Sequence, residues 1–213
     1  MVPIKDDIPN DRVPVVTLAL IAANVLVFLI AGADAAREHG LVPGDVEPWA
    51  FLTSMFVHVG WLHLLGNVLF LWLFGPNVED ACGRVRFLAL YLVGGVVAAA
   101  AQVAVDPGST APLAGASGAV ATIMGAYLRL YPWARILAIV FMVLFFTIVE
   151  IPVVAMLALW AAVQALLAVL DPGSVAVAAH LAGFVLGVAV ARIVATDVKT
   201  PESVLARGRA VTP

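Results

Sequence analysis

The sequence has little charge and almost no cysteine, and each shortage excludes a class of protein. Only 12% of the 213 residues are charged while 63% are hydrophobic, and the mean hydropathy is +1.08. Since charged residues make up about 25% of a typical soluble domain, an ordinary soluble fold is excluded. The single cysteine, Cys82, excludes an intrachain disulfide framework and a metal site built from several cysteines. No block of basic residues is present, so we expect no nucleic-acid partner.

Two hydrolytic motifs are also missing. The chain has no His-Glu-x-x-His segment, which excludes the membrane zinc proteases. It has no pair of aspartates within apolar runs, which excludes an aspartyl protease. His58, His63 and His180 could in principle bind a metal, but no carboxylate or thiolate joins them. We therefore expect neither a metal nor a cofactor.

Long apolar runs are abundant instead. A membrane-spanning helix needs about 20 apolar residues, with a range of about 17–25. One run, Ile136–Val149, is too short for a confident span, and another, Trp61–Phe74, reaches the length only by extending into Asn77–Asp80. The runs are Val13–Gly32, Trp61–Phe74, Phe87–Val105, Leu113–Tyr131, Ile136–Val149, Ile151–Leu170 and Val175–Ala195.

The distribution of positive charges indicates how many of these runs cross the membrane. If Ile136–Val149 stays on the cytoplasmic side, six spans place all eleven Lys and Arg residues except Arg37 in cytoplasmic segments. We therefore predict an all-α fold, a polytopic membrane protein with six transmembrane helices and both termini cytoplasmic. A tail over residues 1–12 and another over 196–213 would flank a membrane domain over 13–195. The expected location is the plasma or inner membrane.

The first run could also be a signal peptide. Lys5 and Arg12 precede it, and Ala31-Gly32-Ala33 is similar to a cleavage site. Its length of roughly 20 residues exceeds the 7–15 of a signal-peptide core. We favour an uncleaved first span.

Polar side chains interrupt three of the runs. Ser117 lies in Gly115-Ala116-Ser117-Gly118, and His63 and Asn67 share one helix face because they are four residues apart. Each feature has a structural explanation: a serine at this place commonly caps a helix, and polar groups commonly tie membrane helices together. Small residues at close spacing commonly serve helix packing, and the glycines that we assign to it are Gly115, Gly125, Gly183 and Gly187.

Depth in the membrane favours a shared site. Ser117 lies four residues into its run and His180 five, and both helices enter from outside. At 1.5 Å per residue each is about 6–8 Å deep. His63 and Asn67 lie in the outer third of their own helix. Four polar side chains from three helices are therefore expected at one level.

A buried Ser–His pair suits covalent acyl transfer. His180 would take the hydroxyl proton as Ser117 attacks a carbonyl, and would then return it to the leaving amine. No Asp or Glu lies at this level, so the pair would be a dyad. The developing oxyanion needs donors, and the candidates are the side chains of Asn67 and His63 and the backbone N–H groups of Ser117 and Gly118.

The chain resembles the rhomboid intramembrane serine proteases. The resemblance runs from about Pro14 to Arg192 and rests on three motifs in the family's order and spacing. These are Gly115-Ala116-Ser117-Gly118, Ala179-His180-Leu181-Ala182-Gly183 followed by Gly187, and His63-Leu64-Leu65-Gly66-Asn67.

The resemblance implies a six-helix core, with Ser117 as nucleophile and His180 as general base. It also implies that His63 and Asn67 help to form the oxyanion site. Substrates would be single-span membrane proteins cut near the outer membrane boundary, so the partners would be such proteins and the lipid bilayer. Two positions depart from the family: Ala121 replaces an aromatic residue that packs on the histidine in many relatives, and Ala50 follows Trp49 where some relatives have Arg.

Two other functions remain as alternatives. A rhomboid-like protein without activity could bind membrane clients, although intact Ser117 and His180 argue against it. A transporter or proton path could use His63 and His180, since intramembrane histidines serve such roles. Labelling by a serine-directed fluorophosphonate separates the protease from both.

Overall fold

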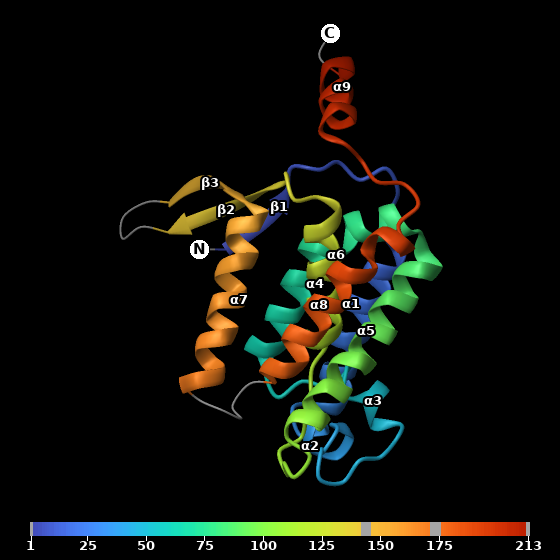
Figure 1. Cartoon of the computed structure of the whole chain (residues 1–213), viewed down its shortest axis with the longest axis vertical. Helices are drawn as coiled ribbons and strands as arrows, with labels where there is room; N and C mark the ends of the chain where they lie inside the picture. Colours follow the sequence, from blue (N-terminus) through green and yellow to red (C-terminus); the bar gives the residue numbers. More distant parts are fainter. Residues whose placement is uncertain (1, 142–145, 171–175, 212–213) are drawn as a thin grey trace.

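The computed structural model describes residues 2–141, 146–170 and 176–211, and this part of the chain is mostly helical (Figure 1). Helices α1, α4, α5 and α8 form a bundle with α6 at its centre, and α7 stands at its edge beneath a small sheet (Figure 1). The helices are α1 (Val15–Ala31), α2 (Ala35–His39), α3 (Ala50–Thr53), α4 (Trp61–Cys82), α5 (Arg84–Val105), α6 (Ser117–Leu130), α7 (Val153–Leu170), α8 (Val177–Val194) and α9 (Pro201–Val211), and the strands are β1 (Val2–Asp6), β2 (Arg135–Phe141) and β3 (Phe146–Pro152).

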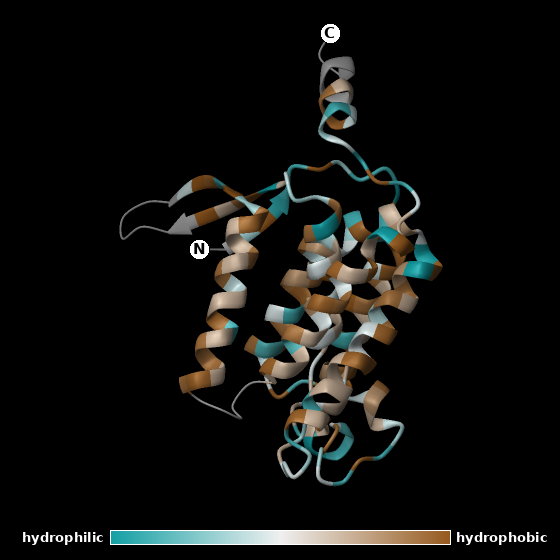
Figure 2. Cartoon of the chain, in the orientation of Figure 1, coloured by the Kyte–Doolittle hydropathy of each residue, from teal (hydrophilic) through white to brown (hydrophobic). Residues whose placement is uncertain are grey.

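Hydrophobic residues make up most of the length of the bundle helices, and hydrophilic residues gather towards the two ends (Figure 2). Among the described residues, α4, α5, α7 and α8 are long and apolar enough to cross a membrane, while α1 is apolar but has 17 residues. Helix α6 has only 14 residues and is buried over most of its length by its neighbours. The chain is an integral, multi-pass membrane protein, and the count of six spans stays a prediction.

The second apolar run extends as its composition predicts. Helix α4 continues from Trp61 through Asn77–Asp80 to Cys82. It ends at Gly83, which has a φ of +76° and directly precedes α5. A residue with a Cβ rarely adopts this φ, so glycine permits a one-residue turn between two helices.

The prediction of an all-α fold is wrong in one region. β1, β2 and β3 form an antiparallel sheet in that order, with Arg135 opposite Pro152 and Phe141 opposite Phe146. The apolar run Ile136–Val149, which we expected not to cross the membrane, is thus part of a two-strand hairpin, apart from residues 142–145, which lie outside the described residues. β-Branched and aromatic residues are frequent in both strands, and such residues favour strands over helices. The fold is mostly helical with one small sheet.

The polar segments at the two ends of the chain pack against the bundle. Lys199 is buried, and its ammonium group lies 2.6 Å from a carboxylate oxygen of Asp80 in α4 and 3.6 Å from one of Asp11. In β1, the carboxylate of Asp6 accepts hydrogen bonds from Tyr127 of α6 and from Asn77 of α4. Burial raises the pKa of Asp6 to about 6, because the charged form loses its hydration. The contacts of Asp6 thus connect β1 to α4 and to the end of α6 opposite Ser117.

Glycine brings α6 and α8 into backbone contact. A Cβ at Gly125 would clash with the carbonyl of Phe184, and a Cβ at Gly187 would clash with that of Thr122. A Cβ at Gly183 would clash with the carbonyl of Gly118. At all three positions the backbone of the neighbouring helix occupies the space of a Cβ, and close approach of this kind is typical of small residues in membrane helices.

Candidate active site

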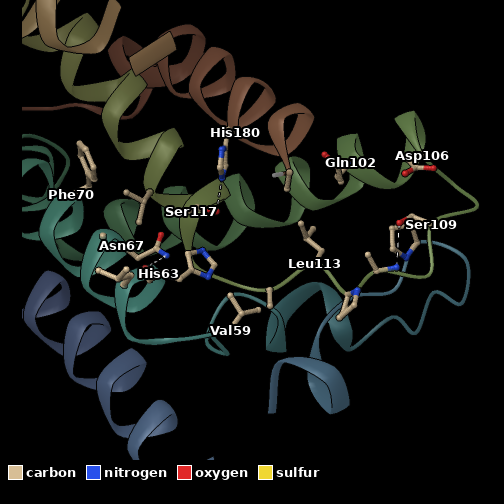
Figure 3. A pocket seen from close by; sticks show the side chains of 18 of the residues that line it. Val59, His63, Asn67, Phe70, Gln102, Asp106, Ser109, Leu113, Ser117 and His180 are labelled. Carbon is tan, nitrogen blue, oxygen red and sulfur yellow. Dashed lines mark hydrogen bonds between the residues drawn. The ribbon is translucent and has the colours of Figure 1, made fainter. Parts of the chain in front are cut away.

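Ser117 and His180 lie within hydrogen-bond distance of each other. The hydroxyl oxygen Oγ of Ser117 is 2.7 Å from Nε2 of His180, although the two residues are 63 positions apart in sequence (Figure 3). Ser117 begins α6, and His180 lies in the first turn of α8. The two side chains meet because both helices start at the same level and pack at backbone distance.

The other ring nitrogen of His180 contacts a residue that the sequence analysis did not single out. Nδ1 of His180 is 2.8 Å from the side-chain oxygen Oε1 of Gln164 in α7, which is 7% exposed. An amide oxygen only accepts hydrogen bonds, so this contact requires the imidazole proton on Nδ1. Nε2 then carries the lone pair and can accept the proton of Ser117. The ring of Trp160 lies beside the imidazole at a centroid distance of 6.2 Å.

His63 and Asn67 lie on one face of α4, as predicted, and both line the same pocket as the dyad (Figure 3). Asn67 is 6% exposed, and its amide Nδ2 donates a hydrogen bond to the backbone oxygen of His63 at 2.9 Å. A primary amide has two N–H donors, so the second remains for another acceptor. Nδ1 of His63 is buried and has no hydrogen-bond partner within the described residues.

His58 does not take part in this arrangement directly. It precedes α4, is fully buried, and packs edge-on against His63 with 5.2 Å between the ring centroids. Burial, together with the neighbouring His63, lowers the pKa of His58 to about 4. The imidazole is therefore neutral at physiological pH, and it packs against the ring of His63.

Three helices point their N-terminal ends at the site. His63, Ser117 and His180 lie in the first turns of α4, α6 and α8, respectively. The N–H groups of a first turn have no acceptor inside their own helix, and they carry the positive end of the helix dipole. The backbone N–H groups of Ser117 and Gly118 are of this kind, so the site favours negative charge beside Ser117 Oγ.

Gly115 has a different role from the one predicted. It precedes α6 and has a φ of +115°, so it does not pack helix against helix. A Cβ there would clash with the ring of His63, and its N–H donates a hydrogen bond to the carbonyl oxygen of Ser54 at 2.8 Å. Only glycine allows the chain to turn this close to His63 before the helix starts at Ser117.

A pocket of about 430 Å³ surrounds the dyad. Polar residues, among them Gln102, Asp106 and Ser109, line one part of it (Figure 3). Other parts of the wall are apolar and include Phe70, Val120, Met124 and Trp160. The reacting atoms of the dyad thus lie where a chain with both polar backbone and apolar side chains can be accommodated.

Within the described residues, no group of three or more His, Cys, Asp or Glu side chains is placed to hold a metal ion. Ala121, the position where many rhomboid relatives have an aromatic residue, is fully buried within α6. The contacts to the imidazole ring come instead from Trp160 and Gln164 of α7. The sequence signal for this contact is Gln164, an isolated polar residue in an apolar run. The sequence of the run does not show which neighbouring helix Gln164 faces.

Comparisons with known proteins agree with this geometry. Residues 45–197 match the family model described as "Rhomboid domain". Over 127 residues the chain is 35% identical to the rhomboid protease GluP of Bacillus subtilis, and the match covers 54% of this chain and 24% of GluP. It is 32% identical over 123 residues to YdcA of the same organism, covering 54% of this chain and 61% of YdcA. The chain is 31% identical over 134 residues to the human mitochondrial presenilin-associated rhomboid-like protein, and the match covers 59% of this chain and 35% of that protein. Each match thus spans less than two thirds of the relative.

Proposed function

Because the chain belongs to the rhomboid family, we propose that it is an intramembrane serine endopeptidase with Ser117 as nucleophile and His180 as general base. The observation that carries the proposal is the 2.7 Å contact between Ser117 Oγ and His180 Nε2 inside a pocket of a membrane protein. An alcohol is a weak nucleophile until a base in hydrogen-bond reach takes its proton.

The reaction begins when Ser117 Oγ attacks the carbonyl carbon of the scissile peptide bond. The hydroxyl proton passes to Nε2 of His180, and the carbonyl oxygen becomes an oxyanion. His180 then gives the proton to the leaving nitrogen as the C–N bond breaks, which leaves an acyl group on Ser117. Water attacks this ester with His180 again as base, and the released Ser117 hydroxyl recovers its proton.

We propose that the oxyanion is stabilised by hydrogen-bond donors held near Ser117 before the reaction begins. These donors are the backbone N–H groups of Ser117 and Gly118, the second N–H of the Asn67 side-chain amide, and the side chain of His63. Donors that are held before the reaction need no reorganisation when charge develops, and such stabilisation is usually the largest single contribution to catalysis.

The substrate class follows from the place of the site. Ser117 and His180 are expected in the outer part of the membrane, so the scissile bond would belong to a membrane-spanning segment near its outer boundary. The apolar part of the pocket suits the side chains of such a segment. The cell membrane, plasma or inner, is the proposed location.

A direct test combines chemistry with proteolysis. The purified protein should react covalently with a fluorophosphonate at Ser117 and should cleave a tagged single-span substrate in proteoliposomes. A rhomboid-like protein that only binds clients would capture the substrate without labelling or cleavage, and that outcome would reject the proposal.

The proposed topology makes a separate prediction. Arg135 lies opposite Pro152 in the β2–β3 hairpin and is 3.7 Å from Glu150, so both ends of the hairpin lie on one side of the bundle. In a Cys82→Ser background, single cysteines at Arg135 and Glu150 should both react with a membrane-impermeant maleimide from the cytoplasmic face. A cysteine at Arg37 serves as the external control. Reaction of the two hairpin positions from opposite faces would refute the six-span topology.

Asn67→Ala tests the oxyanion site. Loss of one such donor typically lowers kcat by about 10²–10³-fold, so cleavage should be impaired but measurable. Reaction with a fluorophosphonate should continue slowly, because the α6 backbone donors remain. The measurement is kcat per folded molecule, taken alongside the melting temperature. A lowered melting temperature with unchanged kcat would instead make Asn67 a packing residue.

A further inference from the structure

Gln164 is the one buried polar residue of α7. The buried side chains of this helix are those of Val153, Leu157 and Gln164, and most of the other residues of the helix are exposed. A polar group that faces the interior of a membrane protein is costly unless it has a hydrogen-bond partner. The side-chain oxygen of Gln164 lies 2.8 Å from Nδ1 of His180. The buried polar residue of α7 thus contacts the proposed general base.

We propose that Gln164 is the positioning residue for His180, fixing both the tautomer and the direction of its imidazole ring. The proposal rests on the dyad proposed above and goes beyond it, because neither the dyad nor the family match assigns this residue. The amide oxygen accepts the N–H of Nδ1, which leaves the lone pair of Nε2 aimed at Ser117. It does what a carboxylate does in a Ser-His-Asp triad, but with a neutral group.

Other neighbours of His180 cannot take this role. Within the described residues, the hydrogen bonds of its side chain are those to Ser117 and Gln164. Trp160 contacts the ring but has only an N–H donor, so it cannot accept from Nδ1. Ala121 has no polar atom in its side chain. The acceptor on Nδ1 is therefore Gln164.

The contact also changes in strength during the reaction. When His180 takes the proton of Ser117, its ring becomes an imidazolium, and the N–H of Nδ1 then forms a hydrogen bond from a charged donor. Such bonds are shorter and roughly twice as strong as neutral ones. Gln164 thus stabilises the transition state more than the resting enzyme, and its removal should lower kcat more than it raises KM.

The main test replaces Gln164 by Met, which has a similar length and lacks the amide acceptor. We expect kcat for a single-span substrate to fall about 10–100-fold, as for the loss of a hydrogen bond to a charged group, with KM little changed. Labelling by a small fluorophosphonate should slow by a similar factor. Because this probe is far smaller than a membrane helix, slower labelling assigns the effect to the dyad rather than to substrate docking.

Nitrogen-15 NMR of labelled histidine supplies a readout that a packing defect would not produce. In the unchanged protein His180 should be protonated on Nδ1, and in Gln164→Met it should populate the Nε2-protonated form. The signals are assigned by their loss in His180→Ala. Gln164→Glu keeps an oxygen at the same place, so it should retain the Nδ1-protonated form and restore most of the labelling rate.

Leu166→Ala is the matched control, since Leu166 lies on the exposed side of α7 and should leave tautomer and rates unchanged. If Gln164→Met does not fold, Gln164→Leu repeats the deletion with another shape. A wild-type labelling rate together with an unchanged tautomer in the deletion variant would overturn the proposal. If the unchanged protein neither labels nor cleaves, the protease proposal fails, while the tautomer measurement still decides the role of Gln164.

Discussion

Ser117→Ala is expected to reduce cleavage of a model membrane substrate to background, a loss on the order of 10⁶-fold in kcat if the pair acts as nucleophile and base do in soluble serine proteases. The substitution removes the only atom that forms the acyl-enzyme bond. It should leave the melting temperature nearly unchanged, because Ser117 is only partly buried and, within the described residues, its side chain forms a hydrogen bond only with His180. Both quantities can be measured on one detergent preparation.

His180→Ala should have nearly the same effect, and the double variant should lose little more than either single one. Two groups that work as a unit show this non-additivity, whereas independent groups would multiply their effects. Ser203→Ala, in the exposed α9 far from the pocket, is the control for the loss of a hydroxyl. Appreciable cleavage by Ser117→Ala would show that another nucleophile is used.

Gly183→Ala should lower both the stability and the reaction rate, although it removes no reacting group. The added Cβ would clash with the carbonyl oxygen of Gly118, the residue next to the nucleophile. Helices α6 and α8 must move apart to accept it, and overpacking of this kind costs about 1–3 kcal/mol of stability. The same movement separates Ser117 from His180, and a displacement of about 1 Å can cost about 10²-fold in rate.

The measurements are the melting temperature and the fluorophosphonate labelling rate per folded molecule, and both should fall. Gly66→Ala in α4 is a control for stability, because a Cβ there meets no atom within 4 Å. Its melting temperature should hold or rise, since alanine favours the helix. If Gly183→Ala labels at the wild-type rate, the close helix approach is not what brings the dyad together.

Much of the site could be predicted because depth in a membrane can be counted along a sequence. Ser117 and His180 lie at comparable distances from the starts of their apolar runs, and the expected meeting of their side chains agrees with the 2.7 Å contact. Gln164 could not be assigned in this way. It lies deep in an apolar run, and only the packing of α7 against α8 shows which polar atom it faces.

The hairpin and the chain ends were missed for a related physical reason. The hydropathy of a short apolar stretch beside a membrane is the same whether it forms a strand or a short helix. A helix forms its backbone hydrogen bonds within itself, whereas a strand needs a partner strand, and hydropathy does not identify that partner. The partner of β2 is partly β1, which comes from the polar N-terminal segment more than a hundred residues earlier. Likewise, Lys199 lies in the segment predicted as a cytoplasmic tail, and its burial against Asp80 could not be read from the sequence.

The placement of His180 on the last bundle helix has a consequence for biosynthesis. Translation delivers Ser117 to the membrane first, and the hairpin, α7 and the start of α8 must follow before the imidazole can reach it. Until then the nucleophile is an ordinary alcohol with no base beside it. Under the proposed mechanism, a nascent chain that has not yet packed α8 against α6 cannot cleave neighbouring membrane proteins at the translocon, so assembly itself delays the onset of proteolysis.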